Sequence, residues 1–365
     1  MVHRTRGWLT VMGVIGLWAL AGGAGLAAGP REAAPAAREQ EKTAIPEIWV
    51  KSFADAPEAE RLIATARSVP VGRRVPLISR YFLGRAYHPE TRTRVRQQHA
   101  KPKTKVEATN EHPLPVKVLP TSLQYLDCMT YVEHVLALAA ADRPDYVNAF
   151  LPCLVDVMYD AGGGPLLNHL RNHFTSHWAD VNERKGYLVN IARGHPAAAR
   201  RVVLLNRVGA NRTFYIEDRF MIAREPQVIH YFPTEAVLAR RVPFRSGDVV
   251  ALVCDKEGLD VLHMGFAIEH GRQWLLRHAS SKLNRIVEED LAGYLKGRPE
   301  VIGVMVLRPR LAAPPPPRYR FRSKAGAEPV GANRQTVTQT PRSARAVAGK
   351  PKRSVAAPAA RRPRR

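Results

Sequence analysis

The hydrophobic pattern changes once along the chain, near Arg201, and this change restricts the fold class. Before it, apolar residues recur every three or four positions, which is typical of amphipathic helices. After it they form short runs between turn residues, which is typical of strands joined by hairpins. We therefore predict an α+β fold, with helices first and a mostly antiparallel sheet after them. Expected helical segments are 54–67, 77–83, 129–139, 146–159, 166–177 and 288–296; expected strands are 202–205, 214–216, 248–253, 259–268, 274–278 and 302–307; a long polar loop is expected at 88–116.

The helix predicted from Met129 is preceded by a capping residue and a candidate nucleophile. Asp127 is a natural N-cap, and Cys128 stands in the first turn. Free cysteine has a pKa of about 8.5, and the unpaired N–H groups and dipole of a helix N-terminus lower it to roughly 3.5–7.5. The alternative is structural, because a lone cysteine on a helix is most often a small buried hydrophobe. The apolar face of this helix consists of Val132, Val135, Leu136 and Ala139.

The charge of the chain lies mostly in its C-terminal tail. The formal net charge is +24, and residues 312–365 hold 14 Lys and Arg against Glu328 alone, so the tail accounts for 13 of these charges. This distribution argues against a specific nucleic-acid-binding fold. The tail is rich in Pro, Ala and Arg and is expected to be disordered. In an exported protein it would contact anionic wall polymer or the membrane surface.

The N-terminus has the order of a secretory signal peptide. His3, Arg4 and Arg6 precede an apolar run over 8–26 that ends in small residues. An uncleaved membrane anchor is the alternative, but Gly and Ala dominate the second half of the run, which favours cleavage. We therefore expect an exported protein, periplasmic or in the cell envelope. The expected organisation is a signal peptide at 1–28, a linker at 29–45, a folded domain at 46–311 and the tail at 312–365.

Three cysteines are an odd number for an exported protein, so at least one thiol is expected to be free or to pair with another chain. Cys153 falls in a predicted helix and Cys254 at the end of a predicted strand, and both are interpreted as structural. The sequence leaves open whether they pair.

Two histidines fall on neighbouring predicted strands. His263 and His278 flank a hairpin around 270–272, so they could lie side by side. A thiolate nucleophile needs a base, and the base needs a third group that fixes its tautomer. A strand histidine is otherwise most often a structural residue.

A second set of histidines suggests a weaker alternative. His169, His173 and His177 would share one helical face and could bind zinc, but no acid accompanies them as in an HExxH motif. We therefore predict no metal site.

Five segments resemble the N-acetylmuramoyl-L-alanine amidase-like family, a branch of the NlpC-type, papain-like cysteine hydrolases of bacterial cell walls. The resemblance covers about 77–309. The sequence departs from the family pattern at Ala86, where Pro is usual, and at 129–131, where Val-Thr-Phe is common. The segments are Phe82–Tyr87 (FLGRAY), Leu126–Glu133 (LDCMTYVE), Arg171–Phe174 with Trp178, Gly258–Ile268 (GLDVLHMGFAI) and Leu275–Ser281 (LLRHASS).

The resemblance implies a papain-like, NlpC-type fold, with the nucleophile at a helix N-terminus packed on the sheet. It implies Cys128 as the nucleophile, His263 as general base and acid, and His278 as the group that orients His263, with no cofactor. It also implies that Asp127, Tyr87 and His173 contact the substrate. The alternatives are that Asp127 only caps the helix and that Tyr87 and His173 are packing residues.

The function implied is hydrolysis of the amide between N-acetylmuramic acid and L-alanine in peptidoglycan or muropeptides. Two alternatives stay open: a stem-peptide endopeptidase of the same fold, and a non-catalytic wall-binding module. The sequence also leaves open the oligomeric state, the choice between intact wall and soluble muropeptides, and any preference for anhydro sugars.

Overall fold

The computed structural model describes residues 45–88, 116, 118–207, 226–311 and 319–325. The expected signal peptide, nearly all of the expected linker, the loop over 89–115, the strand at 214–216 and the tail beyond 325 lie outside the described residues. Within them the fold combines helices with a largely antiparallel sheet, as predicted.

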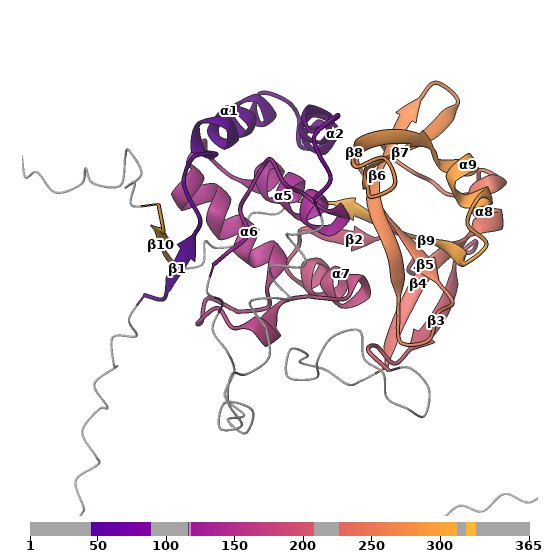
Figure 1. Cartoon of the computed structure of the whole chain (residues 1–365). Helices are drawn as coiled ribbons and strands as arrows, with labels where there is room; N and C mark the ends of the chain where they lie inside the picture. Colours follow the sequence, from indigo (N-terminus) through magenta and orange to yellow (C-terminus); the bar gives the residue numbers. More distant parts are fainter. Residues whose placement is uncertain (1–44, 89–115, 117, 208–225, 312–318, 326–365) are drawn as a thin grey trace, which may run out of the picture. The chain divides into compact units, whose positions relative to one another are not determined.

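The helices come mostly before the sheet strands, in the predicted order (Figure 1). The helix predicted from residue 77 begins earlier, at Val71, as α2. Pro76, just before the predicted start, lies inside the observed helix. No helix of the described residues is both long and apolar enough to cross a membrane. The helical elements are α1 (Ala56–Arg67), α2 (Val71–Tyr81), α5 (Cys128–Ala140), the π-helical turn η1 (Tyr146–Phe150), α6 (Leu151–Met158), the 3₁₀ turn η2 (Asn168–Leu170), α7 (Thr175–Arg184), α8 (Thr234–Leu238) and α9 (Leu291–Lys296).

An eight-stranded sheet carries the second half of the fold. Seven strands follow the order β3-β4-β9-β5-β6-β7-β8, β2 pairs with β9, and all neighbours are antiparallel. The strands predicted over 248–253, 259–268, 274–278 and 302–307 are confirmed as β5, β6, β7 and β9, whereas β4 was not expected. The bounds are β2 (Leu188–Asn190), β3 (Ala199–Val203), β4 (Gln227–Pro233), β5 (Val249–Cys254), β6 (Val261–His270), β7 (Gln273–Ser280), β8 (Arg285–Asp290) and β9 (Val301–Pro309).

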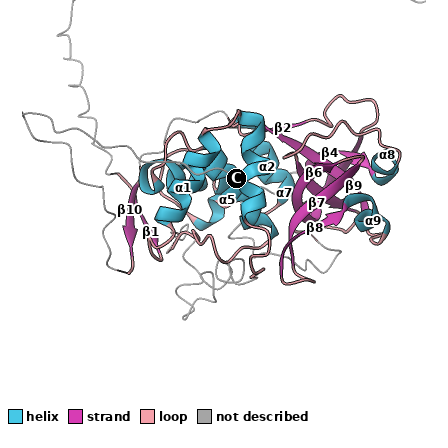
Figure 2. Ribbon diagram, turned by 90° about the horizontal axis from the view of Figure 1, so that it is seen from above, coloured by secondary structure: helices cyan, strands magenta, loops and turns pink. Residues whose placement is uncertain are grey.

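The two faces of the sheet are both covered, which explains why β5 is an unbroken apolar run. Val249, Ala251 and Val253 pack in the core that contains α5 and α6. Val250 and Leu252 pack in a second core with residues of α8 and α9. Figure 2 shows α8 and α9 on the opposite side of the sheet from α5. The catalytic candidates on β6 and β7 are therefore held by a sheet that is packed on both sides.

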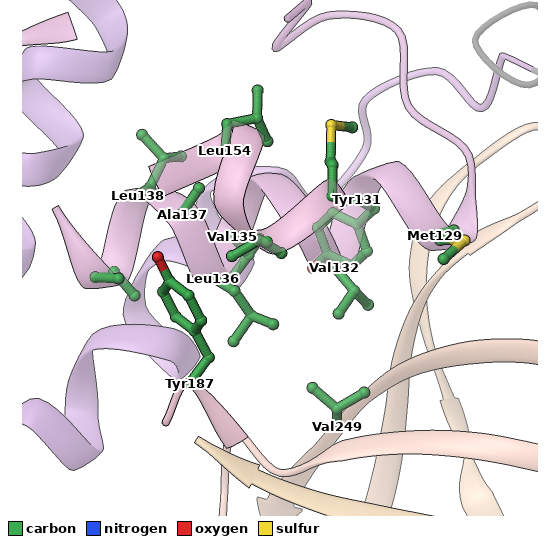
Figure 3. Close-up of a cluster of buried hydrophobic side chains, with 14 of the residues drawn as sticks. Met129, Tyr131, Val132, Val135, Leu136, Ala137, Leu138, Leu154, Tyr187 and Val249 are labelled. Carbon is green, nitrogen blue, oxygen red and sulfur yellow. The ribbon is translucent and has the colours of Figure 1, made fainter. Parts of the chain in front are cut away.

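Helix α5 is the centre of the larger core. The sequence predicted an amphipathic helix, but all of its 13 residues are buried. Figure 3 shows its apolar side chains surrounded by those of other elements, including Leu154 of α6, Tyr187 and Val249 of β5. A helix buried on all sides has little freedom to move, so the residue at its N-terminus is rigidly placed.

The folded region continues beyond its expected end at 311. β10 (Arg320–Ser323) pairs in parallel with β1 (Glu47–Val50), so the prediction that 312–365 is disordered is wrong for these residues. Phe321 is buried in the core beside Ile48 and accounts for this order. Tyr319 also packs against this core, and the basic composition of the tail obscured both anchoring side chains.

Candidate functional site

Cys128 is the first residue of α5, and the preceding residue caps the helix as predicted. One carboxylate oxygen of Asp127, Oδ1, accepts hydrogen bonds from the backbone N–H groups of Met129 (3.0 Å) and Thr130 (2.8 Å). The Thr130 hydroxyl lies 2.9 Å from the Asp127 backbone nitrogen and completes a capping box. Oδ2 of Asp127 is buried, with no hydrogen-bond partner among the described residues.

The first turn of α5 packs against the strand that carries His263. Tyr131, one turn after Cys128, meets Phe266 of β6 edge to face with ring centroids 5.4 Å apart. The Tyr131 hydroxyl donates to the carbonyl oxygen of Ser79 at 2.9 Å, so α2 also holds this turn. The N-terminus of α5 is therefore fixed between α2 and the sheet.

His263 and His278 lie side by side, as the hairpin predicted. The two strands are joined at Gly271, which has a φ of 59°. Nε2 of His263 lies 2.7 Å from Nδ1 of His278, which is a hydrogen-bond distance. Burial lowers the pKa of His278, although hydrogen bonding and charge interaction with Glu289 oppose this shift. His278 is therefore neutral near pH 7.

Glu289 is the residue that the sequence analysis missed. Its Oε2 lies 2.8 Å from Nε2 of His278, so a carboxylate extends the histidine pair. The segment 288–296 was predicted as a helix, but its first residues belong to β8, where Glu289 pairs with Leu276. The Asp290 side chain caps α9 at Gly293, which explains where the strand gives way to the helix.

Tyr294 of α9 covers the histidine pair. Its ring is nearly parallel to that of His263, with centroids 6.3 Å apart, and edge to face with that of His278 at 5.2 Å. The guanidinium of Arg298 stacks on the Tyr294 ring, 3.8 Å from its centroid. Burial raises the pKa of Tyr294, the positive charge of Arg298 opposes this shift, and the negative charge of Glu289 adds to it.

Gly265 permits the close approach of the two histidine strands. A Cβ at this position would lie 2.5 Å from the Arg277 carbonyl oxygen and 2.8 Å from Cβ of His278. We expect Gly265→Ala to displace His278 from His263, to cost about 1–3 kcal/mol of stability and to lower kcat/KM about 100-fold. Gly72→Ala is the control, because a Cβ at Gly72 would meet no atom within 4 Å. Denaturant unfolding and steady-state kinetics measure both effects, and unchanged kinetics of Gly265→Ala would refute this role.

Tyr87 lies next to the segment that leads into the cysteine helix. It forms a parallel bridge with Leu126, two residues before Cys128. Its backbone N–H donates to the carbonyl oxygen of Asn284 at 2.9 Å, at the turn between β7 and β8. Ala86 stands where the family pattern usually has Pro. It forms a bridge with Arg285 at the start of β8, so the arrangement exists despite this difference. The structure thus brings Tyr87 to the N-terminus of α5.

His173 lies in a segment tied to α5 and α6 by its neighbours. The guanidinium of Arg171 forms two contacts of 2.7 Å with the carboxylate of Glu133 on α5. The backbone N–H of Asn172 donates to the carbonyl oxygen of Met158 at the end of α6. These contacts fix the backbone just before His173, while a contact between His173 and the cysteine–histidine group stays a prediction.

The predicted helix over 166–177 is wrong. His169 lies in a 3₁₀ turn, His173 in a stretch without regular secondary structure, and His177 in α7, which begins at Thr175. The three side chains therefore do not share a helical face, and the geometry on which the zinc alternative depended is not formed. The Gly162–Gly164 break and the buried Asn172 favour the irregular backbone.

Asp260, just before β6, secures the start of α7. Its Oδ2 accepts a hydrogen bond of 2.6 Å from the backbone N–H of Ser176, while Phe174, the N-cap residue, provides no side-chain cap. The carboxylate thereby links the entry of the histidine strand to the segment that holds His173. Burial raises the pKa of Asp260.

The three cysteines all lie in the described part of the chain, and none of them forms a disulfide. Cys153 on α6 and Cys254 on β5 do not pair, which answers the question that the sequence left open. Burial raises the pKa of Cys153 to about 12 and also raises that of Cys254, so both thiols stay protonated at neutral pH.

The model of the N-acetylmuramoyl-L-alanine amidase-like family matches residues 77–304. The chain therefore belongs to this family, whose name indicates a hydrolase acting on the bacterial cell wall. No curated protein matches the chain significantly.

Solved structures show the same fold. A Legionella pneumophila protein superposes with a TM-score of 0.52 at 22% identity, covering 73% of this chain and 96% of that one. An N-acetylmuramoyl-L-alanine amidase from Bacteroides uniformis superposes with a TM-score of 0.50 at 22% identity, covering 69% and 99%. At these identities the similarity concerns the fold, and the chemistry must be argued from the residues.

Proposed function

We propose that the protein is an exported cysteine amidase of the NlpC-type, papain-like class, which cleaves the bond between the lactyl group of N-acetylmuramic acid and L-alanine. The observation that carries this proposal is the 2.7 Å hydrogen bond between His263 and His278 on strands packed against the turn that begins with Cys128. Family membership supplies the substrate class. The fold class is supported by the nucleophile candidate at a helix N-terminus against an antiparallel sheet.

In the proposed mechanism the Cys128 thiolate attacks the lactyl carbonyl carbon and forms a C–S bond. The backbone N–H of Cys128, at the N-terminus of α5, helps to hold the oxyanion. His263 gives its proton to the departing alanine nitrogen as the C–N bond breaks. It then takes a proton from water, which attacks the thioester, releases the carboxylic acid and regenerates the thiol.

Asp127, Tyr87 and His173 are the proposed substrate-binding residues. The buried Oδ2 of Asp127 supports a role beyond capping, because a buried carboxylate oxygen normally has a hydrogen-bond donor. A substrate N–H group next to the scissile bond would supply that donor. The position of Tyr87 beside Leu126 supports a contact with the same end of the substrate.

Asp127→Asn separates the two roles of this side chain. An amide oxygen can still accept from Met129 and Thr130, so the helix cap and the stability are expected to persist. The negative charge at Oδ2 is lost, and we expect KM to rise about tenfold, the equivalent of 1.4 kcal/mol. Asp127→Ala should additionally lose about 1 kcal/mol of stability. An unchanged KM in Asp127→Asn would limit Asp127 to capping, which thermal unfolding and steady-state kinetics can decide.

The test of the proposed function is mass spectrometry of defined muropeptides incubated with the full chain and with Cys128→Ala. Release of the whole stem peptide from intact sugar, absent in the variant, is the expected result. Cleavage within the stem would contradict the amidase assignment and indicate an endopeptidase. No cleavage of any muropeptide would contradict catalysis and favour a wall-binding module, for which the basic tail would be the contact with anionic polymer.

A further inference from the structure

A carboxylate extends the histidine pair, and this determines where protons reside. Nε2 of His263 faces Nδ1 of His278 at 2.7 Å, and Nε2 of His278 faces Oε2 of Glu289 at 2.8 Å. A neutral imidazole has one donor nitrogen and one acceptor nitrogen, whereas a carboxylate only accepts. The three groups therefore form a chain whose direction is set at its carboxylate end.

The proton positions follow one by one. Since Glu289 accepts, Nε2 of His278 carries a proton and donates it. Burial keeps His278 neutral near pH 7, so its Nδ1 is an acceptor. Nε2 of His263 must then donate to it, and Nδ1 of His263 becomes the basic nitrogen of that ring.

We infer that Glu289 is a positioning residue that, through His278, selects the Nε2-protonated tautomer of His263 and so makes Nδ1 the nitrogen that exchanges a proton with Cys128. This inference rests on the proposed function for the role of Cys128. Glu289 itself lies two hydrogen bonds away from His263 and touches no reacting atom.

Glu289 is held in place by the contacts of β8, although its side chain is partly exposed. Its side chain is 38% exposed, so its replacement does not remove core packing. The neighbouring residue on β8, Glu288, pairs with Arg277, which also donates to the carbonyl oxygen of Pro76 and the hydroxyl of Ser79 on α2. β8 is thus tied to β7 and α2, which holds the Glu289 carboxylate in line with His278.

The charged groups around His278 have opposite effects on the protonation of its ring. Glu289 on β8 favours the protonated ring, whereas burial and the positive charge of Arg298 disfavour it. The ring of Tyr294 on α9 lies against both histidines, and His263 on β6 is the remaining titratable contact. Removal of the Glu289 charge leaves Arg298 unopposed and makes an imidazolium in this pair less stable. A thiolate–imidazolium pair at Cys128 and His263 should then form only at higher pH.

The experiment measures alkylation of Cys128 by iodoacetamide against pH in the full chain, with mass spectrometry of the peptide that contains it. Glu289→Gln removes the charge and allows either direction of the hydrogen-bond chain, because an amide can accept or donate. Glu289→Asp keeps an acceptor without a donor. Glu269→Gln is the matched control, since Glu269 is an exposed carboxylate on β6 at the far end of the hairpin. Cys153 and Cys254, which stay protonated, are internal references.

We expect the pH of half-maximal Cys128 alkylation to rise by about one unit in Glu289→Gln. This corresponds to about a tenfold lower alkylation rate on the acid limb of the profile. Muropeptide hydrolysis by this variant should show a lower kcat at an unchanged KM, with partial recovery in Glu289→Asp. An alkylation profile of Glu289→Gln equal to that of the wild type, or an equal shift in Glu269→Gln, would overturn the inference. Alkylation needs no substrate, so this result is independent of whether the amidase proposal holds.

Discussion

Replacement of Cys128 by alanine is expected to lower kcat for muropeptide hydrolysis by about six orders of magnitude, as removal of the nucleophile does in other triads. The proposed acyl-enzyme cannot form without the thiol. Cys128 begins a buried helix and is 8% exposed, so the loss of one sulfur should leave the fold intact. Time courses of stem-peptide release, with equal thermal unfolding of both proteins, measure this effect.

The same mechanism predicts non-additivity. His263→Ala should reduce kcat nearly as much as Cys128→Ala, and the double variant should be no slower than either single variant, because the two residues act as one unit. Cys153→Ala is the control, since this protonated thiol lies on α6 and belongs to no proposed step. Retention of substantial activity by Cys128→Ala would exclude the cysteine mechanism.

The sequence predicted those parts of the site that local patterns encode. Asp127 and Cys128 follow from helix-capping rules, and the pairing of His263 with His278 follows from a hairpin of known length. Both depend on residues close in sequence. The helix α5 itself was correctly placed, although its burial on every side depends on packing partners that a single helix pattern does not reveal.

Glu289 shows why the rest was not predicted. The pattern over 288–296 is helix-like, yet Arg285–Asp290 is an edge strand because β7 offers a partner and Asp290 caps the following helix. Strand formation here depends on tertiary pairing, which overrides local preference. The same holds for Arg171, whose role follows only from its contact with Glu133, 38 residues earlier in the chain.

Arg171→Ala is expected to destabilise the protein by about 3–5 kcal/mol, because it leaves the Glu133 carboxylate buried without the guanidinium that balances its charge. The two side chains are 6% and 0% exposed, and their bidentate contact is the link between α5 and the segment that holds His173. A control is Arg184→Ala, whose pair with Asp160 is largely exposed on the arginine side and is worth about 0–1 kcal/mol. Denaturant unfolding of both variants measures the difference.

Two further measurements test whether the uncompensated charge is the cause. In Arg171→Ala the pKa of Glu133 should rise above its unfolded value of about 4.3. A carboxyl whose folded pKa is raised contributes stability at low pH and loses it as the pH rises, so the deficit against the wild type should shrink on acidification. A Glu133→Gln/Arg171→Met double variant should recover most of the lost stability, because it removes both charges. If the deficit persists at low pH and in the double variant, the cost comes from lost packing of Arg171 on Tyr159, whose ring lies 5.6 Å from the guanidinium carbon, and the ion pair is then not what holds this segment to α5.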